Sequence, residues 1–167
     1  MCLSSQHSNR RFWNTVGEIL HLFRIHAAIS VALFPVLGAL TARPQTSVWA
    51  LLALFGVGLS PYIYGTILND IVDLRVDQLI PPQSPQADRP LVKGTISTKT
   101  ALFLALLHLA FSFLFLLAMS PVVQSTYIVM FLACALASIY NLFGKHFPIS
   151  PILGDACLGS SLALLCI

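Results

Sequence analysis

The amino-acid sequence predicts an all-α fold, a polytopic bundle of helices that cross a membrane. Composition is the first reason: apolar residues make up 57% of the chain, charged residues only 9%, and the mean hydropathy is +0.84. Such values do not fit a soluble domain. The second reason is that the apolar residues gather in runs of about 20, the length that a helix needs to cross about 30 Å of hydrocarbon. A lipid bilayer is therefore the expected solvent.

Five apolar runs are each expected to form a helix. Four are long enough to span a bilayer, and they lie at residues 19–40, 48–68, 101–119 and 122–143. The fifth opens near residue 152 and is still apolar at residue 167, so it predicts a partial span. Residues 1–18 are expected to form a polar tail without the features of a cleaved secretory signal, and residues 19–167 one transmembrane domain.

The basic residues predict the orientation of this bundle. Eight of the nine lie before or at the start of the first span, or in the links after the second and fourth spans, whereas Arg43 lies in a link on the other side. The positive-inside rule then places the N-terminus and the two basic links in the cytosol. Because the basic residues form no continuous stripe, nucleic acid is not an expected partner.

One link stands out by its length. Residues 71–100 separate the second and third spans and hold four prolines and four basic residues. Long links in compact proteins are usually functional or disordered. We therefore interpret this segment as a cytosolic active-site loop.

An acidic motif at the end of the second span carries the sharpest chemical signal. The sequence reads N-D-x-x-D-x-x-x-D, with Asn69, Asp70, Asp73 and Asp77 at the named positions. If the helix continues through the motif, these side chains share one face. Crowded carboxylates need a cation, and Mg²⁺ prefers such oxygen ligands and shares its shell with phosphates. The motif therefore predicts a magnesium site that binds a diphosphate, and a solvated helix end is the alternative.

A basic segment follows the acidic motif. Arg89 and Lys93 lie in the sequence D-R-P-L-V-K-G-T-I-S, which leads into the third span. Arginine binds phosphate oxygens through a bidentate fork, and lysine binds them as a point charge. A solvated loop explains these charges almost as well, but their position next to the acidic motif favours a role in diphosphate binding.

Together these motifs resemble the UbiA superfamily of intramembrane aromatic prenyltransferases. Two shorter features add to the resemblance: Arg24 in L-F-R-I-H opens the first span, and Tyr140 precedes Lys145 after the fourth. For the fold, the resemblance implies a nine-helix bundle with a central cavity. It also implies Mg²⁺ and diphosphate ligands at Asn69, Asp70, Asp73 and Asp77, with the three aspartates catalytic, and diphosphate contacts at Arg24, Arg89, Lys93 and Lys145.

The sequence departs from the family in one respect. The family has a second aspartate-rich motif on a later helix, whereas the one acid after Asp88 is Asp155, in D-A-C-L-G. The favoured explanation is a truncated chain, which alone is expected to catalyse no prenyl transfer although weak Mg²⁺-dependent diphosphate binding can survive.

The expected function is that of a membrane-embedded isoprenoid enzyme. By resemblance, a prenyl group passes from a Mg²⁺-bound prenyl diphosphate to an aromatic or similar electron-rich acceptor. A terpene cyclase on the same scaffold and a non-catalytic membrane fragment or subunit that binds a lipid diphosphate remain alternatives. Among single residues, His21 and His26 are candidates for the mouth of the diphosphate site, and His108 is interpreted as a hydrogen-bonding residue of the bundle interior.

Overall fold

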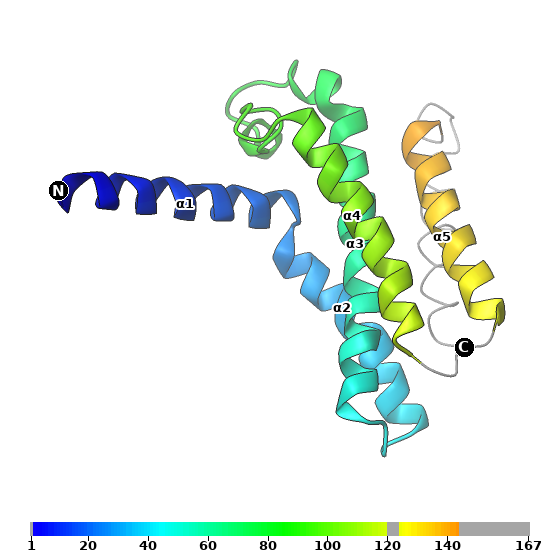
Figure 1. Cartoon of the computed structure of the whole chain (residues 1–167). Coiled ribbons are helices and arrows are strands. Elements are labelled where there is room, and N and C mark those ends of the chain that lie inside the picture. The colour runs from blue at the N-terminus through cyan, green and yellow to red at the C-terminus, as the bar shows by residue number, and fades with distance from the viewer. Residues whose placement is uncertain (1, 120–123, 144–167) are drawn as a thin grey trace.

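The structure, a computed structural model, describes residues 2–119 and 124–143. These residues form helices, turns and loops without a strand, which confirms the predicted all-α fold (Figure 1). In chain order the elements are α1 (Cys2–Leu22), α2 (Ile25–Ala42), α3 (Val48–Asp77), the short 3-10 helix η1 (Pro85–Asp88), α4 (Thr98–Leu117) and α5 (Gln124–Leu142). The predicted partial span at residues 152–167 lies outside the described residues.

Three of the described helices are long and apolar enough to cross a membrane. They are α2, α3 and α4, and α5 contains a shorter apolar stretch, Met130–Leu142. Many of their large side chains are exposed on the outside of the bundle, as in Phe34, Phe103 and Phe131. An exposed apolar surface of this kind suits lipid rather than water, because lipid tails do not oppose the exposure of apolar groups.

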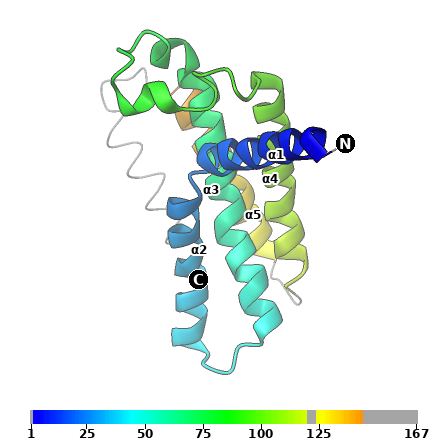
Figure 2. The same ribbon diagram turned by 90° about the vertical axis from the view of Figure 1, so that its left-hand side faces the viewer.

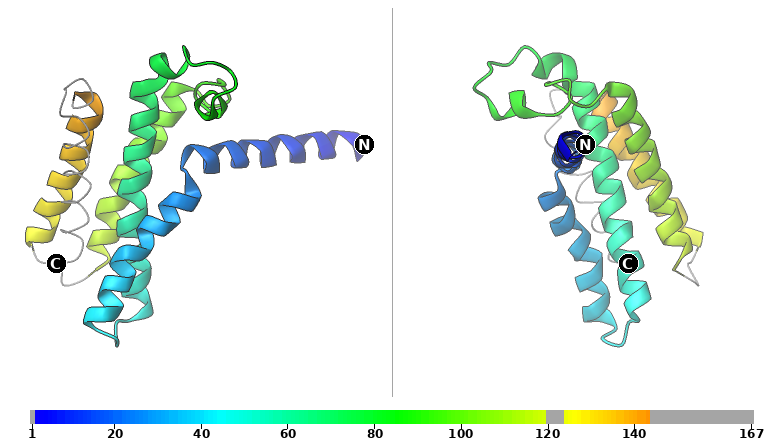
Figure 3. Two further views of the ribbon diagram at one scale, coloured as in Figure 1. Left: turned by 180° about the vertical axis from the view of Figure 1, so that it is seen from behind. Right: turned by 60° about the vertical axis from the view of Figure 1, so that its left-hand side comes forward.

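Helix α3 is the central helix of the bundle. It packs against α2 and α4, and the Tyr64 hydroxyl lies 2.6 Å from the Ser138 hydroxyl of α5. Figures 2 and 3 show α2 and α4 running along α3. The close approach of α2 depends on Gly58, since a Cβ there would lie 2.9 Å from the Cα of Ala32. Small residues at helix contacts allow this approach in membranes.

The first predicted span is divided into two helices. Helix α1 ends at Leu22, and Arg24 has a left-handed backbone conformation with φ 47° and ψ 49°. After this turn α2 runs in a clearly different direction from α1 (Figure 1). The predicted tail at residues 1–18 and span at 19–40 therefore differ from the structure, where α1 begins at Cys2 and the span at Ile25. Apolar periodicity alone does not reveal this boundary, because Ile19 and Leu22 are as apolar as the span that follows.

Helix α3 continues through the acidic motif to Asp77. This is the condition under which the motif residues are expected to share one helical face. The link to α4 is consequently shorter than the predicted 71–100, because α3 ends at Asp77 and α4 begins at Thr98. The Ser97 hydroxyl caps α4 by accepting a hydrogen bond from the backbone N–H of Thr100 at 3.1 Å. The link at residues 78–97 contains η1 and lies at the same end of the bundle as α1 (Figure 3).

Candidate functional site

The acidic motif places two buried carboxylates at the end of α3. Asp70 is 3% exposed and Asp77 is 6% exposed. Residues seven apart in a helix differ in direction by only about 20°. Asp70 and Asp77 therefore point to the same side, one two turns beyond the other. An ionised carboxylate buried in this way needs a cationic partner or several hydrogen bonds.

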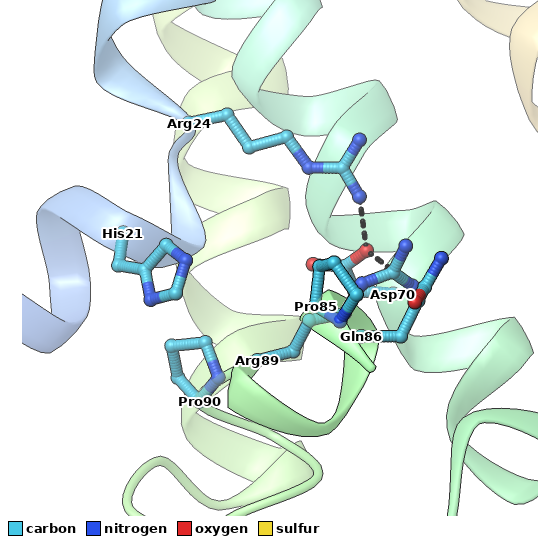
Figure 4. Close-up of a pocket in the computed structure, with 7 residues that line it drawn as sticks. All are labelled: His21, Arg24, Asp70, Pro85, Gln86, Arg89 and Pro90. Carbon is cyan, nitrogen blue, oxygen red and sulfur yellow. Dashed lines mark hydrogen bonds and ion pairs between the residues drawn. The ribbon is translucent and has the colours of Figure 1, made fainter. Parts of the chain in front are cut away.

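Two arginines from separate segments supply these partners. Arg24, at the corner between α1 and α2, donates from Nη2 to Oδ1 of Asp70 at 2.6 Å. Arg89, at the end of η1, donates from Nη1 to Oδ2 of Asp77 and lies 3.4 Å from Oδ1 of Asp70. Figure 4 shows both guanidinium groups directed at Asp70. The site thus joins three segments that are distant in the sequence.

The local backbone explains how each arginine reaches the carboxylates. The left-handed conformation of Arg24 is strained for a residue other than glycine, at about 1 kcal/mol, and it occurs where the chain turns from α1 into α2. Arg89 is held by backbone hydrogen bonds from its own N–H to the Gln86 carbonyl at 3.1 Å and from the Lys93 N–H to its carbonyl at 3.0 Å. Both arginines are therefore fixed by the fold and not only by their ion pairs.

A pocket of about 220 Å³ opens beside these ion pairs. Its lining combines polar groups with proline rings, and it comprises His21, Arg24, Asp70, Pro85, Gln86, Arg89 and Pro90. Pockets for drug-sized ligands usually measure about 300–1,000 Å³. The volume therefore suits the polar head of a ligand better than a whole lipid.

The other two residues of the motif form a second pair beside the first. The Asn69 amide donates from Nδ2 to Oδ2 of Asp73 at 3.1 Å. Both side chains are half-buried, and neither lines the pocket. Within residues 2–119 and 124–143, no three histidine, cysteine or acidic side chains gather closely enough to hold a metal ion. Arg89 occupies the cation position between Asp70 and Asp77 instead.

Lys93 lies in a different environment from the two arginines. Its Nζ forms an ion pair with Oδ1 of Asp88 at 2.6 Å, and both side chains are exposed enough to meet solvent. The hydrogen bond from Lys93 lowers the pKa of Asp88 below its ordinary value, and Asp88 raises the pKa of Lys93. Lys93 does not line the pocket.

The remaining predicted residues have different outcomes. Lys145 lies outside the described residues, so the structure does not place it. His21 lines the pocket, whereas His26 is exposed and lies outside the lining. His108 packs edge-on against Phe23 with ring centroids 4.8 Å apart, but its Nδ1 has no hydrogen-bond partner within the described part of the chain. The prediction that His108 makes interior hydrogen bonds is therefore not met at this atom.

Two site features escaped sequence reasoning. Gln86 lines the pocket, and a glutamine in a polar loop gives no signal of its own. The Thr95 hydroxyl donates to Oε2 of Glu18 at 3.0 Å and so links the loop to α1. Gly94, with φ 70°, has the left-handed conformation that turns the loop back at this point. No spacing in the sequence relates residues 77 positions apart.

The fold and the site define a helical membrane protein with a buried carboxylate and arginine cluster at one end of its bundle. Its sequence agrees with this class: a family profile described as the UbiA prenyltransferase family matches residues 31–167. The chain therefore belongs to the UbiA prenyltransferase family. No curated protein is similar enough to the chain to count as a match.

Several solved structures share the fold. The chain resembles a digeranylgeranylglyceryl phosphate synthase with a TM-score of 0.77 and 21% identity, over 91% of this chain and 52% of that one. It also resembles the apo structure of a UbiA homologue from Aeropyrum pernix K1, with a TM-score of 0.69 and 24% identity, over 84% of this chain and 49% of that one. A UbiA homologue from Archaeoglobus fulgidus, bound to DMAPP and Mg²⁺, gives a TM-score of 0.69 and 22% identity over 89% and 52%. The chain thus spans about half the length of these proteins.

Proposed function

We propose that the chain provides a diphosphate-binding site of an intramembrane prenyltransferase. The reaction moves a prenyl group from a prenyl diphosphate to an aromatic or similar electron-rich acceptor. One observation carries the proposal: the buried Asp70 and Asp77 meet Arg24 and Arg89 around a pocket sized for a polar head group. Family membership and the relative from Archaeoglobus fulgidus, which is bound to DMAPP and Mg²⁺, support it.

The arginines are suited to grip the leaving diphosphate. Each guanidinium can present two N–H groups to a pair of phosphate oxygens. As the bond between the allylic carbon and the diphosphate oxygen breaks, negative charge develops on the diphosphate, and donors already fixed in place stabilise it. Arg24 and Arg89 are held by the fold, so their reorganisation during the reaction is small. His21 and Gln86, which also line the pocket, add two further polar side chains beside the diphosphate.

The acidic motif also fits Mg²⁺ by the chemistry of its donors. Asp70, Asp73 and Asp77 offer carboxylate oxygens and Asn69 an amide oxygen, and Mg²⁺ needs few protein ligands because it keeps waters and shares substrate phosphates. These four residues would hold the ion after their side chains rearrange, since in their present positions no three acidic side chains of the described residues gather closely enough for it. When bound, Mg²⁺ neutralises part of the diphosphate charge. For Asp70 and Asp77 to contribute, Arg24 must release Asp70 and Arg89 must release both carboxylates when the substrate binds, and the phosphate oxygens offer the two arginines new partners.

We further propose that the site faces the cytosol. The N-terminus and residues 78–97 would then lie on the cytosolic side, and the turn that contains Arg43 on the other. The support for this orientation is the distribution of the nine basic residues, eight of which fall on one side. Prenyl diphosphates are charged at one end. A site at the membrane surface therefore lets the diphosphate stay near water while the prenyl group of the substrate enters lipid.

Binding of geranyl diphosphate to the chain in lipid nanodiscs, with and without Mg²⁺, tests the proposed function. Asp73→Asn and Asp77→Asn should each weaken Mg²⁺-dependent binding by roughly tenfold or more, a loss of at least about 1.4 kcal/mol. Asp88→Asn is the matched control, because Asp88 is an acid in the adjoining loop whose partner is Lys93. Equal binding by all three variants would reduce the motif to a solvated helix end.

Substitution of the arginines gives a second test in the same binding experiment, with its own control. Arg24→Gln and Arg89→Gln should weaken binding with or without Mg²⁺, since they act on the phosphate oxygens. Arg75→Gln changes an exposed arginine of α3 and should leave binding near that of the unchanged chain. If Arg75→Gln weakens binding as much as Arg24→Gln, the effect is one of general charge and the proposed pocket is wrong.

A further inference from the structure

Helix α1 is not part of the bundle that spans the membrane. It runs across the direction of α3 and extends away from α2, α3 and α4 over most of its length (Figures 1 and 3). Because α2 begins at Ile25 and is long enough to cross a bilayer, the end of α1 lies where the chain enters the membrane. A helix that runs across the spans at that depth lies along the membrane surface.

The sequence of α1 is amphipathic with a helical period. Phe12, Val16, Ile19 and Leu20 fall within one face of a helix with 3.6 residues per turn, and Trp13 borders it. Phe12 is 60% exposed, Trp13 63% and Leu20 42%. The rings of Phe12 and Trp13 touch edge-on with centroids 5.4 Å apart. Two large aromatic side chains this exposed next to each other indicate a surface that contacts something apolar.

The rotation of α1 about its own axis is fixed by a polar contact. Glu18 accepts a hydrogen bond from Thr95, which places the Glu18 side of α1 against the loop at residues 78–97. Val16, at the middle of the apolar face, lies nearly opposite Glu18 on the helical wheel, since two residues are about 200° apart, and Phe12 lies about 120° from Glu18. Figures 1 and 2 show the loop on one side of α1 and α2 on the other. The apolar face is therefore turned away from the loop, toward the side where the spans lie.

We propose that α1 lies flat on the bilayer that its own bundle spans, with Phe12, Trp13, Val16 and Leu20 in the boundary between head groups and acyl chains. The bilayer is the expected partner of this face because the bilayer that surrounds α2 continues beneath the apolar face of α1. Aromatic side chains favour this boundary. Helices of this type bury their apolar face about 5–10 Å into it.

This placement also gives α1 a role in ordering the site. Glu18 contacts the loop that carries Arg89, and His21 lines the pocket. A helix anchored in the membrane surface along its length therefore provides a fixed support for two walls of the pocket.

Fluorescence quenching by brominated lipids tests the proposal on the full chain. The chain has two tryptophans, so Trp49→Phe leaves Trp13 as the single reporter. In nanodiscs, bromines near the carbonyl end of the acyl chain should quench Trp13 roughly twice as strongly as bromines near the methyl end, since the helix lies at shallow depth. Stronger quenching by the deep bromines, or by neither, overturns the proposal.

Two further variants test which face of α1 meets lipid. In a background with Trp13→Phe and Trp49→Phe, Val16→Trp places the reporter on the apolar face and Asn14→Trp on the opposite face. The first should be quenched by shallow bromines and shielded from aqueous acrylamide, and the second should show the reverse. Equal quenching at the two positions contradicts a helix that lies on the membrane with one fixed face. No arm of the experiment measures prenyl transfer, so its failure would leave the proposed function standing.

Discussion

Arginines lie near both ends of helix α3, but the two ends differ in what surrounds them. At the Val48 end, Arg43 and Trp49 are exposed, and the turn closes through local contacts such as the hydrogen bond from the Thr46 hydroxyl to the Arg43 carbonyl at 2.6 Å. At the Asp77 end, Asp70 and Asp77 are buried beneath Arg24 and Arg89. A hairpin of two helices builds the first end, whereas three separate segments build the second.

This difference teaches how a membrane protein concentrates chemistry at one surface. An arginine in a two-helix turn reaches water directly and needs no partner in the protein. A carboxylate covered by a loop and by the corner of another helix has lost most of its water, so its counter-ions must come from the fold. Charge at the membrane surface thus becomes a site only where additional segments cover it.

The orientation of the two ends is an all-or-none prediction. A glycosylation or cysteine-labelling reporter inserted within residues 80–99 should report the cytosolic side, and one at residues 43–47 the opposite side. The reason is the bias of lysine and arginine toward the cytosol. The reverse labelling pattern would place the site outside the cytosol and would overturn the proposed orientation.

Removing one buried carboxylate should give the next largest effect. Asp70→Asn leaves Arg24 without its ion pair and weakens the hold on Arg89. Loss of one partner of a buried pair costs about 3–5 kcal/mol, and because Arg24 is 38% exposed we expect nearer about 2 kcal/mol. The free energy of unfolding in mixed detergent micelles measures it. Arg43→Ala at the other end is the control, with a change within about 0.5 kcal/mol. Similar losses in both variants would erase the contrast between the two ends.

Disturbing the close packing between α2 and α3 should lower the free energy of unfolding by less than Asp70→Asn does, but by a measurable amount. In Gly58→Ala the new Cβ meets the backbone of Ala32, so α2 must shift and Arg24 moves with it. Overpacking of this kind costs about 1–3 kcal/mol, and we expect the lower end, about 1 kcal/mol, because the nearest atom would lie 2.9 Å away, a mild overlap. Gly65→Ala in the same helix is the control, because nothing lies within 4 Å of its Cβ position, and it should be neutral or stabilising. The same unfolding assay decides, and equal destabilisation by the two variants would show that the contact with Ala32 is not responsible.

The smallest expected change in stability comes from Asp88→Asn, which removes the exposed ion pair between Asp88 and Lys93. Because the pKa of Asp88 is lowered below 3.8, its contribution is present above pH 3.8 and is lost as pH falls through the folded value. The pKa of Lys93 is raised above 10.5, so its contribution is lost only as pH rises through that folded value. The stability difference between the unchanged chain and Asp88→Asn should therefore be small and flat between about pH 5 and 9. If this stability difference changes with pH between about pH 5 and 9, the pKa directions given for Asp88 and Lys93 do not describe the pair.

The sequence by itself determined the solvent, the class of fold and the acidic motif. Apolar runs of span length leave few alternatives to helices, because backbone polar groups in lipid must be satisfied within the helix. The spacing of Asp70, Asp73 and Asp77 is local and follows from 3.6 residues per turn, so their presence on one helix was predictable. Arg24 and Arg89 were predicted as contacts of the diphosphate by resemblance, but their partners in the fold were not.

Only the tertiary structure decided where the chain turns and which charges meet. The corner at Arg24 depends on a backbone conformation that no residue type there announces, since arginine rarely adopts it. The division of the motif into the pair of Asp70 and Asp77 and the pair of Asn69 and Asp73 depends on which side of α3 the loop covers. The link from Glu18 to Thr95 joins residues 77 apart. Contacts between distant segments arise from packing, and local periodicity carries no record of them.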